Sequence, residues 1–311
     1  MISTISRAFT LVFAASLLAC PAAPPQPAKT PNEEPAKAKP APAPPKKEAF
    51  KMATDVDKRL SQFSPTAVDF DDKLVAPEYR PVLKKLVQAA QILDGLYLKQ
   101  VDAKNPALRQ KLVDEKAPAA VLDYFDVMYG PWDRLAGDEP FVGERHKPHG
   151  AGFYPEDLGK EELEAWIKAH PEQEKAFRGY FTVIQRDGEG LKAVPYAEFY
   201  GDELKQAAAL LTEAAAASPH KALKKYLATR AAAFLSNDYY ESDKAWMDLG
   251  DSPIEVVIGP YEVYEDRLMG YKAAFEAFIT LRDPDYSDRM KVVARYQKQL
   301  EANLPLPAKY K

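Results

Sequence analysis

The chain contains very little cysteine and histidine, and this scarcity limits its chemistry. Cys20 is the only cysteine among 311 residues, so the protein cannot form an internal disulfide. Only four histidines are present and none is followed by glutamate, so the His-Glu-x-x-His zinc motif is absent. His146 and His149 have a spacing that can chelate a metal, but Pro148 lies between them and no third ligand is evident. An exposed polar loop is therefore the better interpretation of this pair.

Other features of common functional classes are missing as well. The sequence has no Gly-x-Ser-x-Gly elbow, no Walker A loop and no Gly-x-Gly-x-x-Gly motif. Its net charge is −4, without long like-charged runs or a basic stripe, which argues against nucleic-acid binding. No apolar stretch reaches the roughly twenty residues that a membrane-spanning helix needs.

The first twenty residues are typical of an export signal. Arg7 precedes a mostly apolar run over residues 8–18, too short to span a bilayer. The run ends in LLAC (17–20), which resembles the lipobox of bacterial lipoproteins. That resemblance implies cleavage before Cys20 and acylation of its side chain, and several acyl chains anchor a protein better than one. We predict a signal peptide over 1–19 and a protein lipid-anchored in the cell envelope, facing the periplasm or the cell surface. The alternative is an ordinary signal peptide with an incidental cysteine.

A second compositional boundary lies near residue 50. Residues 21–50 hold ten of the chain's 27 prolines and almost no large apolar side chains, so they cannot repay the entropy cost of folding. We predict a disordered stalk over 20–50, which in polyproline II geometry would reach up to roughly 90 Å. Residues 51–311 remain for one large domain or two small ones.

Most of residues 51–311 has the apolar periodicity of helices. Helices are predicted over 81–101, 118–128, 160–170, 172–180, 202–217, 221–235, 271–281 and 288–303. Two short strands, 181–184 and 191–194, flank the turn DGEG (187–190) and predict a β-hairpin. The stretch 254–264 is rich in β-branched and aromatic residues and is the best candidate for a central strand. The predicted fold class is mainly α with a small β portion (α+β).

The stretch 239–279 points to a family. It contains YYESDKAWMDL (239–249), IEVVIGPYEVYED (254–266) and GYKAAFEAFI (270–279). This stretch resembles the dipeptidyl peptidase III family of zinc peptidases (family M49), especially its shorter bacterial members. Weaker resemblance includes GPWDR (130–134), GFYP (152–155) and LPLP (304–307), so that it covers about 80–311. Residues 258–278 are its most specific part.

The resemblance implies roles for Glu262 and Tyr264, which match an acid and a tyrosine of the family's substrate cleft. The acid would bind the free α-ammonium of a peptide through a charge-assisted hydrogen bond, and this contact would fix the cleavage point two residues from the N-terminus. The tyrosine hydroxyl would stabilise the scissile carbonyl as it becomes an oxyanion. Glu276 also matches a recurrent family glutamate, although a structural role fits it equally well.

The residues themselves allow a second interpretation of Glu262. Simple alternation along an extended segment places Ile258, Pro260, Glu262 and Tyr264 on one side. If that side is buried, Glu262 needs a partner, because an unpaired buried charge is costly. The alternative to substrate binding is therefore a structural salt bridge to a nearby basic side chain, Arg267 or Lys272.

The departure from the family pattern concerns the metal. The resemblance implies a zinc site of His-Glu-x-x-x-His or His-Glu-x-x-His plus a further glutamate, and no such motif occurs here. We therefore expect no metal in this chain. Zinc is expected only where the C-terminal half of the family fold is present, and that half is either missing by truncation or encoded separately. The predicted function is the substrate-recognition part of a dipeptidyl peptidase III-like enzyme, inactive alone, whose partners are a peptide and, through Cys20, a membrane. The alternatives are a non-catalytic lipoprotein that binds peptides or an envelope partner, and an unrelated helical envelope protein.

Overall fold

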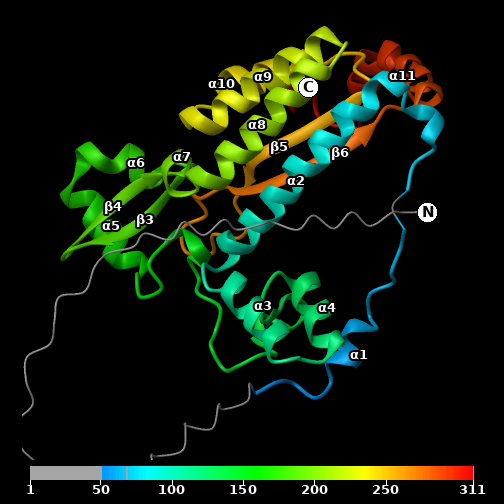
Figure 1. The fold of residues 1–311 in the computed structure, drawn as a ribbon. Helices are drawn as coiled ribbons and strands as arrows, with labels where there is room; N and C mark the ends of the chain where they lie inside the picture. Colours follow the sequence, from blue (N-terminus) through cyan, green and yellow to red (C-terminus); the bar gives the residue numbers. More distant parts are fainter. Residues whose placement is uncertain (1–50, 68, 311) are drawn as a thin grey trace, which may run out of the picture. The chain divides into compact units, whose positions relative to one another are not determined.

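In the computed structural model, residues 51–67 and 69–310 are described, and helices dominate them (Figure 1). The predicted signal peptide, the lipid on Cys20 and the stalk lie outside these residues. The helices are α1 (Val56–Leu60), α2 (Arg80–Val101), α3 (Asn105–Asp114), α4 (Ala119–Met128), α5 (Lys160–Ala169), α6 (Glu174–Arg178), α7 (Tyr196–Phe199), α8 (Gly201–Ala217), α9 (Lys221–Ser236), α10 (Tyr240–Met247) and α11 (Pro284–Ala302). In this part of the chain, no helix combines the length and apolar character needed to cross a membrane.

Three antiparallel two-stranded sheets accompany the helices. They pair β1 (Trp132–Asp133) with β2 (Glu139–Pro140), β3 (Thr182–Asp187) with β4 (Gly190–Pro195), and β5 (Ile254–Glu262) with β6 (Ala274–Leu281). The mainly helical α+β fold class is therefore confirmed. The predicted hairpin is also confirmed as β3–β4, with Asp187 paired to Gly190 at its turn.

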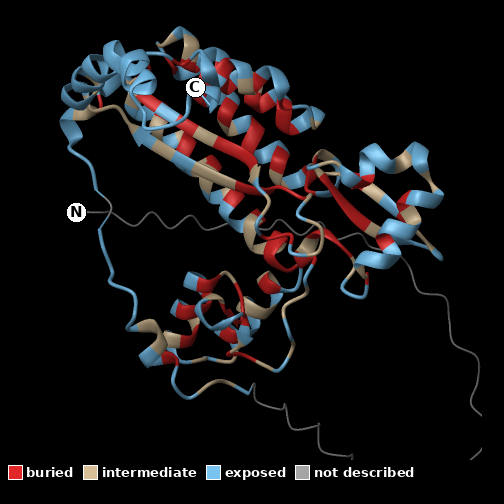
Figure 2. Ribbon diagram, turned by 180° about the vertical axis from the view of Figure 1, so that it is seen from behind, coloured by how far each residue is buried: buried red, intermediate tan, exposed pale blue. Residues whose placement is uncertain are grey.

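The main core lies where four neighbouring helices meet the β5–β6 ribbon. Helices α2, α8, α9 and α10 pack side by side in that order, and the ribbon lies against them (Figures 1 and 2). On α2 the side chains of Leu86, Leu93 and Leu96 recur at helical spacing and are fully or almost fully buried. Phe275 of β6 packs its ring against Phe234 of α9, which fixes the ribbon to the helices.

A smaller second core forms around α1, α3 and α4. Its buried side chains include Val56, Leu112, Tyr124, Phe125 and Phe141. The segment that follows α4 runs back toward the ribbon, where Arg134 forms an ion pair described below. Residues 51–67 and 69–310 together form one compact unit.

Two predictions about the last third of the chain were wrong. Residues 271–281 were predicted as a helix, but 274–281 form strand β6. The stretch mixes helix formers (Ala and Glu) with strand formers (Phe, Ile and Thr), so pairing with β5 and burial of Phe275 decide its conformation. Strand β5 was predicted as central, but it pairs only with β6 among the described residues and ends at Glu262.

Candidate functional site

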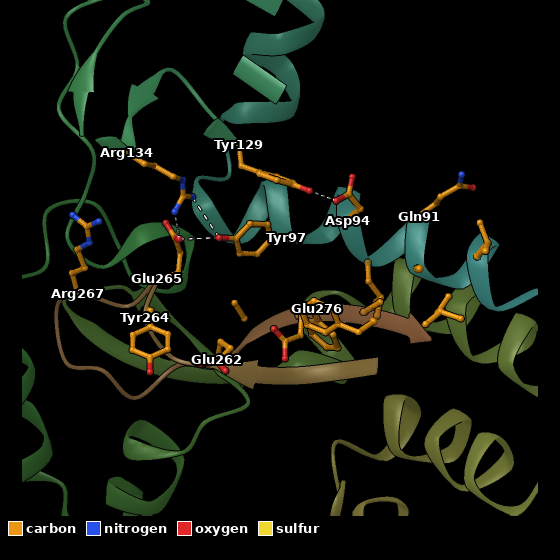
Figure 3. Close-up of a pocket in the computed structure, with 18 residues that line it drawn as sticks. Gln91, Asp94, Tyr97, Tyr129, Arg134, Glu262, Tyr264, Glu265, Arg267 and Glu276 are labelled. Carbon is orange, nitrogen blue, oxygen red and sulfur yellow. Dashed lines mark hydrogen bonds and ion pairs between the residues drawn. The ribbon is translucent and has the colours of Figure 1, made fainter. Parts of the chain in front are cut away.

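A cleft of about 670 Å³ lies between helix α2 and strand β6 (Figure 3). One face of α2 lines it, because Val87, Gln91, Asp94 and Tyr97 follow one another at intervals of three or four residues. The opposite wall is the stretch 274–279 of β6. Glu262 at the end of β5 and the segment that follows it, with Tyr264, Glu265 and Arg267, line the cleft together with Tyr129 and Arg134.

The edge of β6 that faces the cleft is not paired with another strand of the described residues. The amide of Phe275 points outward from this edge and donates to Gln100 Oε1 of α2 at 2.7 Å. Backbone groups two residues apart on a strand point the same way. The amides and carbonyls of Ala277 and Ile279 therefore face the cleft, where they are available to an extended ligand.

Glu262 lines this cleft and is exposed. Within residues 51–67 and 69–310 it forms no ion pair, so the structural salt bridge considered from sequence does not form. Arg267 instead pairs with Asp138. The ammonium of Lys272 is buried and donates to the carbonyls of Phe177 and Gly179 at 2.6 and 2.9 Å and to a threonine hydroxyl.

A second carboxylate shares the cleft with Glu262. Glu276 is half-buried on β6, one strand over from Glu262. Burial and the negative charge of Glu262 raise the pKa of the Glu276 carboxyl above its ordinary value. Two carboxylates that repel each other in a partly buried cleft are stabilised by a bound cation. On α2, Asp94 accepts a hydrogen bond from the hydroxyl of Tyr129 and adds a third acidic group.

The side chain of Tyr264 is 80% exposed, whereas its neighbour Glu265 is buried. Glu265 accepts hydrogen bonds from Arg134 at 2.9 Å and from the Tyr97 hydroxyl at 3.0 Å, and it forms an ion pair with Lys147. Burial raises the pKa of Glu265, but the charges of Lys147 and Arg134 outweigh that effect and lower it. These contacts hold the segment that carries Tyr264.

Asp266 stabilises the same segment from inside. Its carboxylate accepts hydrogen bonds from the Tyr154 hydroxyl and from four backbone amides, those of Leu268, Met269, Tyr271 and Lys272. Neither Glu265 nor Asp266 was predicted as a functional residue, although the two residues end the YEVYED run (261–266) within the stretch that carried the family resemblance. Their partners at positions 97, 134, 147 and 154 come together only in the fold.

The pattern of alternation predicted for β5 does not hold at Glu262. Ile258 and Pro260 are buried, while Glu262 and Tyr264 are exposed. The reason is a change of register between Pro260 and Glu262: Pro260 pairs with Phe275, and Glu262 pairs with Ala274. Two residues of β5 therefore advance against one residue of β6, which is a β-bulge.

The described residues do not form a zinc site. They contain no group of three or more histidine, cysteine, aspartate or glutamate side chains arranged to hold a metal ion. His146 and His149 line a separate hollow of about 260 Å³ together with Lys147, Arg267 and Asp138, and the carboxylate of Asp138 is already paired with Arg267. No chemical step that depends on a metal is therefore assigned to these residues.

Comparison with known proteins identifies the family. The model of peptidase family M49 matches residues 182–311. The structure of dipeptidyl peptidase III from Caldithrix abyssi is 50% identical with a TM-score of 0.79, covering 81% of this chain and 49% of that chain. The enzyme from Corallococcus sp. strain EGB is 44% identical with a TM-score of 0.74, covering 80% of this chain and 47% of that chain.

A curated relative, Nudix hydrolase 3 from Arabidopsis thaliana, is 35% identical over 82% of this chain and 40% of its own length. Both the sequence and the fold thus resemble those of a family of peptidases. More narrowly, the chain belongs to the dipeptidyl peptidase III family, peptidase family M49, as predicted from residues 239–279. It spans about half the length of the two solved relatives.

Proposed function

We propose that this chain recognises the N-terminal end of a peptide in the cleft between α2 and β6. It would act as the substrate-recognition part of a dipeptidyl peptidase III-like peptidase. The observation that carries the proposal is the pair of carboxylates, Glu262 and Glu276, beside an unpaired strand edge. A peptide with a free N-terminus offers the matching groups: one cation and an extended backbone.

The strand edge supplies affinity without regard to side chains. A peptide that lies along β6 can exchange main-chain hydrogen bonds with the outward-facing groups of Ala277 and Ile279. Helix α2 forms the other wall of the cleft and restricts the peptide to an extended path.

The carboxylates supply the selectivity for the peptide's N-terminus. Glu262 has no cationic partner within the described part of the chain, and its charge already disfavours ionisation of Glu276. An α-ammonium group between them would relieve this repulsion and form charge-assisted hydrogen bonds. The exposed Tyr264 follows two residues later, and the family resemblance supports an oxyanion-stabilising role for its hydroxyl.

We expect the purified chain to bind no stoichiometric zinc and to cleave no peptide, since zinc would be held by the C-terminal part of the family fold, whether covalently joined or supplied as a separate chain. Elemental analysis and a dipeptide-release assay check this expectation. One zinc per chain together with dipeptide release would contradict it.

The N-terminal segment adds a proposed location. LLAC at residues 17–20 supports export and acylation at Cys20, which would anchor the protein in the cell envelope. Metabolic labelling with a fatty-acid analogue should mark the wild-type chain and leave Cys20→Ser unlabelled. Equal labelling of both would show that Cys20 is not the lipidated residue.

Peptide binding is tested with Glu262→Gln, which keeps the shape of the side chain and removes its charge. Hydrogen bonds to charged groups contribute about 1.5–3 kcal/mol, so the Kd of a free-amine peptide should rise at least about tenfold. The N-acetylated form of the same peptide should be affected little. Glu255→Gln is the matched control, because Glu255 is an exposed glutamate on the same strand that does not line the cleft. Equal losses for the two peptides would remove Glu262 from the proposed role.

A further inference from the structure

We propose that Arg230 of α9 is a positioning residue for the cleft: it holds the β5 bulge through Tyr261 and thereby keeps Glu262 on the cleft side of the ribbon. The inference rests on the proposed role of Glu262 as the ammonium-binding group. It concerns a residue that neither lines the cleft nor touches a ligand there.

Arg230 is a fully buried arginine surrounded by tyrosine rings. Its guanidinium carbon lies 5.4 Å from the ring centroid of Tyr226, 5.3 Å from that of Tyr239 and 5.5 Å from that of Tyr261. Nη2 donates to Asp243 at 2.6 Å, while Nε and Nη1 have no hydrogen-bond partner among the described residues. Burying such a group is costly, and the ring faces offset part of that cost through cation–π attraction.

The backbone beside Arg230 leaves room for its guanidinium because residue 259 is a glycine. Gly259 has a φ of +152°, and a Cβ atom at this position would lie 2.7 Å from Nη1 of Arg230 and 3.3 Å from the ring of Tyr261. Only glycine combines this backbone conformation with so close an approach. Arg230, Gly259 and Tyr261 therefore form one packed unit at the start of the bulge.

The bulge decides which way Glu262 faces. Ile258 pairs with Ala277 and Pro260 pairs with Phe275, so both lie on the side of the ribbon that contacts the helices. Side chains alternate strictly along a regular strand, so without the extra residue Glu262 would share that buried side. Because Tyr261 is inserted, Glu262 pairs with Ala274 and lies on the same side as Glu276.

Tyr261 is thus the extra residue of the bulge, and Arg230 is its anchor. Loss of the guanidinium removes the surface on which the Tyr261 ring rests and the charge that its π face attracts. The bulge is then free to adopt the regular register, which turns the carboxylate of Glu262 away from the cleft. Although Arg230 does not line the cleft, its loss should therefore remove the preference of the cleft for peptides with a free α-ammonium.

The test compares Arg230→Met with the wild-type full chain. The Kd of a free-amine peptide and of its N-acetylated form are measured by fluorescence anisotropy, and the readout is the Kd of the acetylated peptide divided by the Kd of the free-amine peptide. We expect this ratio to fall at least about tenfold, to the level of Glu262→Gln, because the same charge-assisted contact is lost. The double variant Arg230→Met/Glu262→Gln should show no further fall in this ratio, because both changes remove the same interaction. Arg230→Lys should restore part of the ratio.

Two further variants separate positioning from general stability. Tyr261→Leu leaves the Arg230–Asp243 pair in place and tests the same bulge should Arg230→Met fail to fold. Arg178→Met is the control, because Arg178 also stacks on a tyrosine, Tyr271, at 5.5 Å but lies on the surface away from the cleft. Its ratio should equal that of the wild type.

The outcomes distinguish this inference from the proposed function. If Glu262→Gln abolishes the preference while Arg230→Met and Tyr261→Leu keep it, Arg230 has only a structural role and the proposed function stands. A lowered melting temperature with an unchanged ratio leads to the same conclusion. If the wild-type chain shows no preference for the free amine, both the proposed function and the positioning role are wrong.

Discussion

The buried ion cluster around Glu265 offers the sharpest test of how the cleft is held together. The side chains of Glu265 and Lys147 are each 5% exposed, and Arg134 donates to the same carboxylate at 2.9 Å. Glu265→Gln keeps the shape but leaves two cations close together without this counter-charge. Removing one partner of a buried ion pair typically costs about 3–5 kcal/mol of the free energy of unfolding. For a domain of this size, that corresponds to a melting temperature lower by about 6–20 °C.

The control for this variant is an exposed pair of the same chemistry. Glu174 and Arg178 are 2.8 Å apart, with 52% and 40% of their side chains exposed, so Glu174→Gln should cost at most about 1 kcal/mol. Thermal unfolding followed by circular dichroism measures both. Since the pKa of Glu265 is lowered in the fold, its contribution is complete above the ordinary glutamate pKa and is lost as pH falls through the lowered value. Equal melting temperatures for the two variants, or an unchanged acid sensitivity in Glu265→Gln, would refute the reasoning.

Three further predictions follow from single contacts. Because the pKa of Glu276 is raised, this carboxylate is protonated at a higher pH than an ordinary glutamate. Binding of a cationic peptide should therefore weaken as pH falls through that pKa, and Glu276→Gln should make the Kd depend less on pH. A wild-type Kd that does not change with pH would contradict this. Gly152→Ala should destabilise the protein by about 1–3 kcal/mol, because a Cβ at this position would lie 2.4 Å from the Lys99 carbonyl oxygen. Gly95→Ala in α2, where nothing lies within 4 Å, should stabilise the protein by about 0.5–1 kcal/mol. A denaturant titration that ranks the two variants in the opposite order would refute both assignments. Lys272→Met leaves two backbone carbonyls without a donor and should cost at least about 2 kcal/mol in the same titration, and an unchanged midpoint would contradict it.

The long helices and the hairpin could be predicted because their signals are local. The prediction over 81–101 matches α2, Arg80–Val101, since apolar residues recur at helical spacing there. Ser218-Pro219 separates α8 from α9 as predicted, because proline cannot continue a helix. The family resemblance likewise depended on a contiguous run of residues, and it directed attention to Glu262 and Tyr264.

The features that only the tertiary structure decided all join distant parts of the chain. Residues 274–281 mix helix and strand formers, and they become a strand because β5 is available to pair with them. The buried partners of Glu265 lie at positions 97, 134 and 147, so no local pattern could reveal the cluster.

The side of the ribbon on which Glu262 lies is the clearest case. Alternation alone placed it with Ile258 and Pro260, and the bulge anchored by Arg230 placed it in the cleft. Sequence by itself therefore determined the helical elements, the hairpin and the family, since these depend on neighbours along the chain. The geometry of the cleft depended on contacts between α9, α2 and the ribbon, which exist only once the chain has folded.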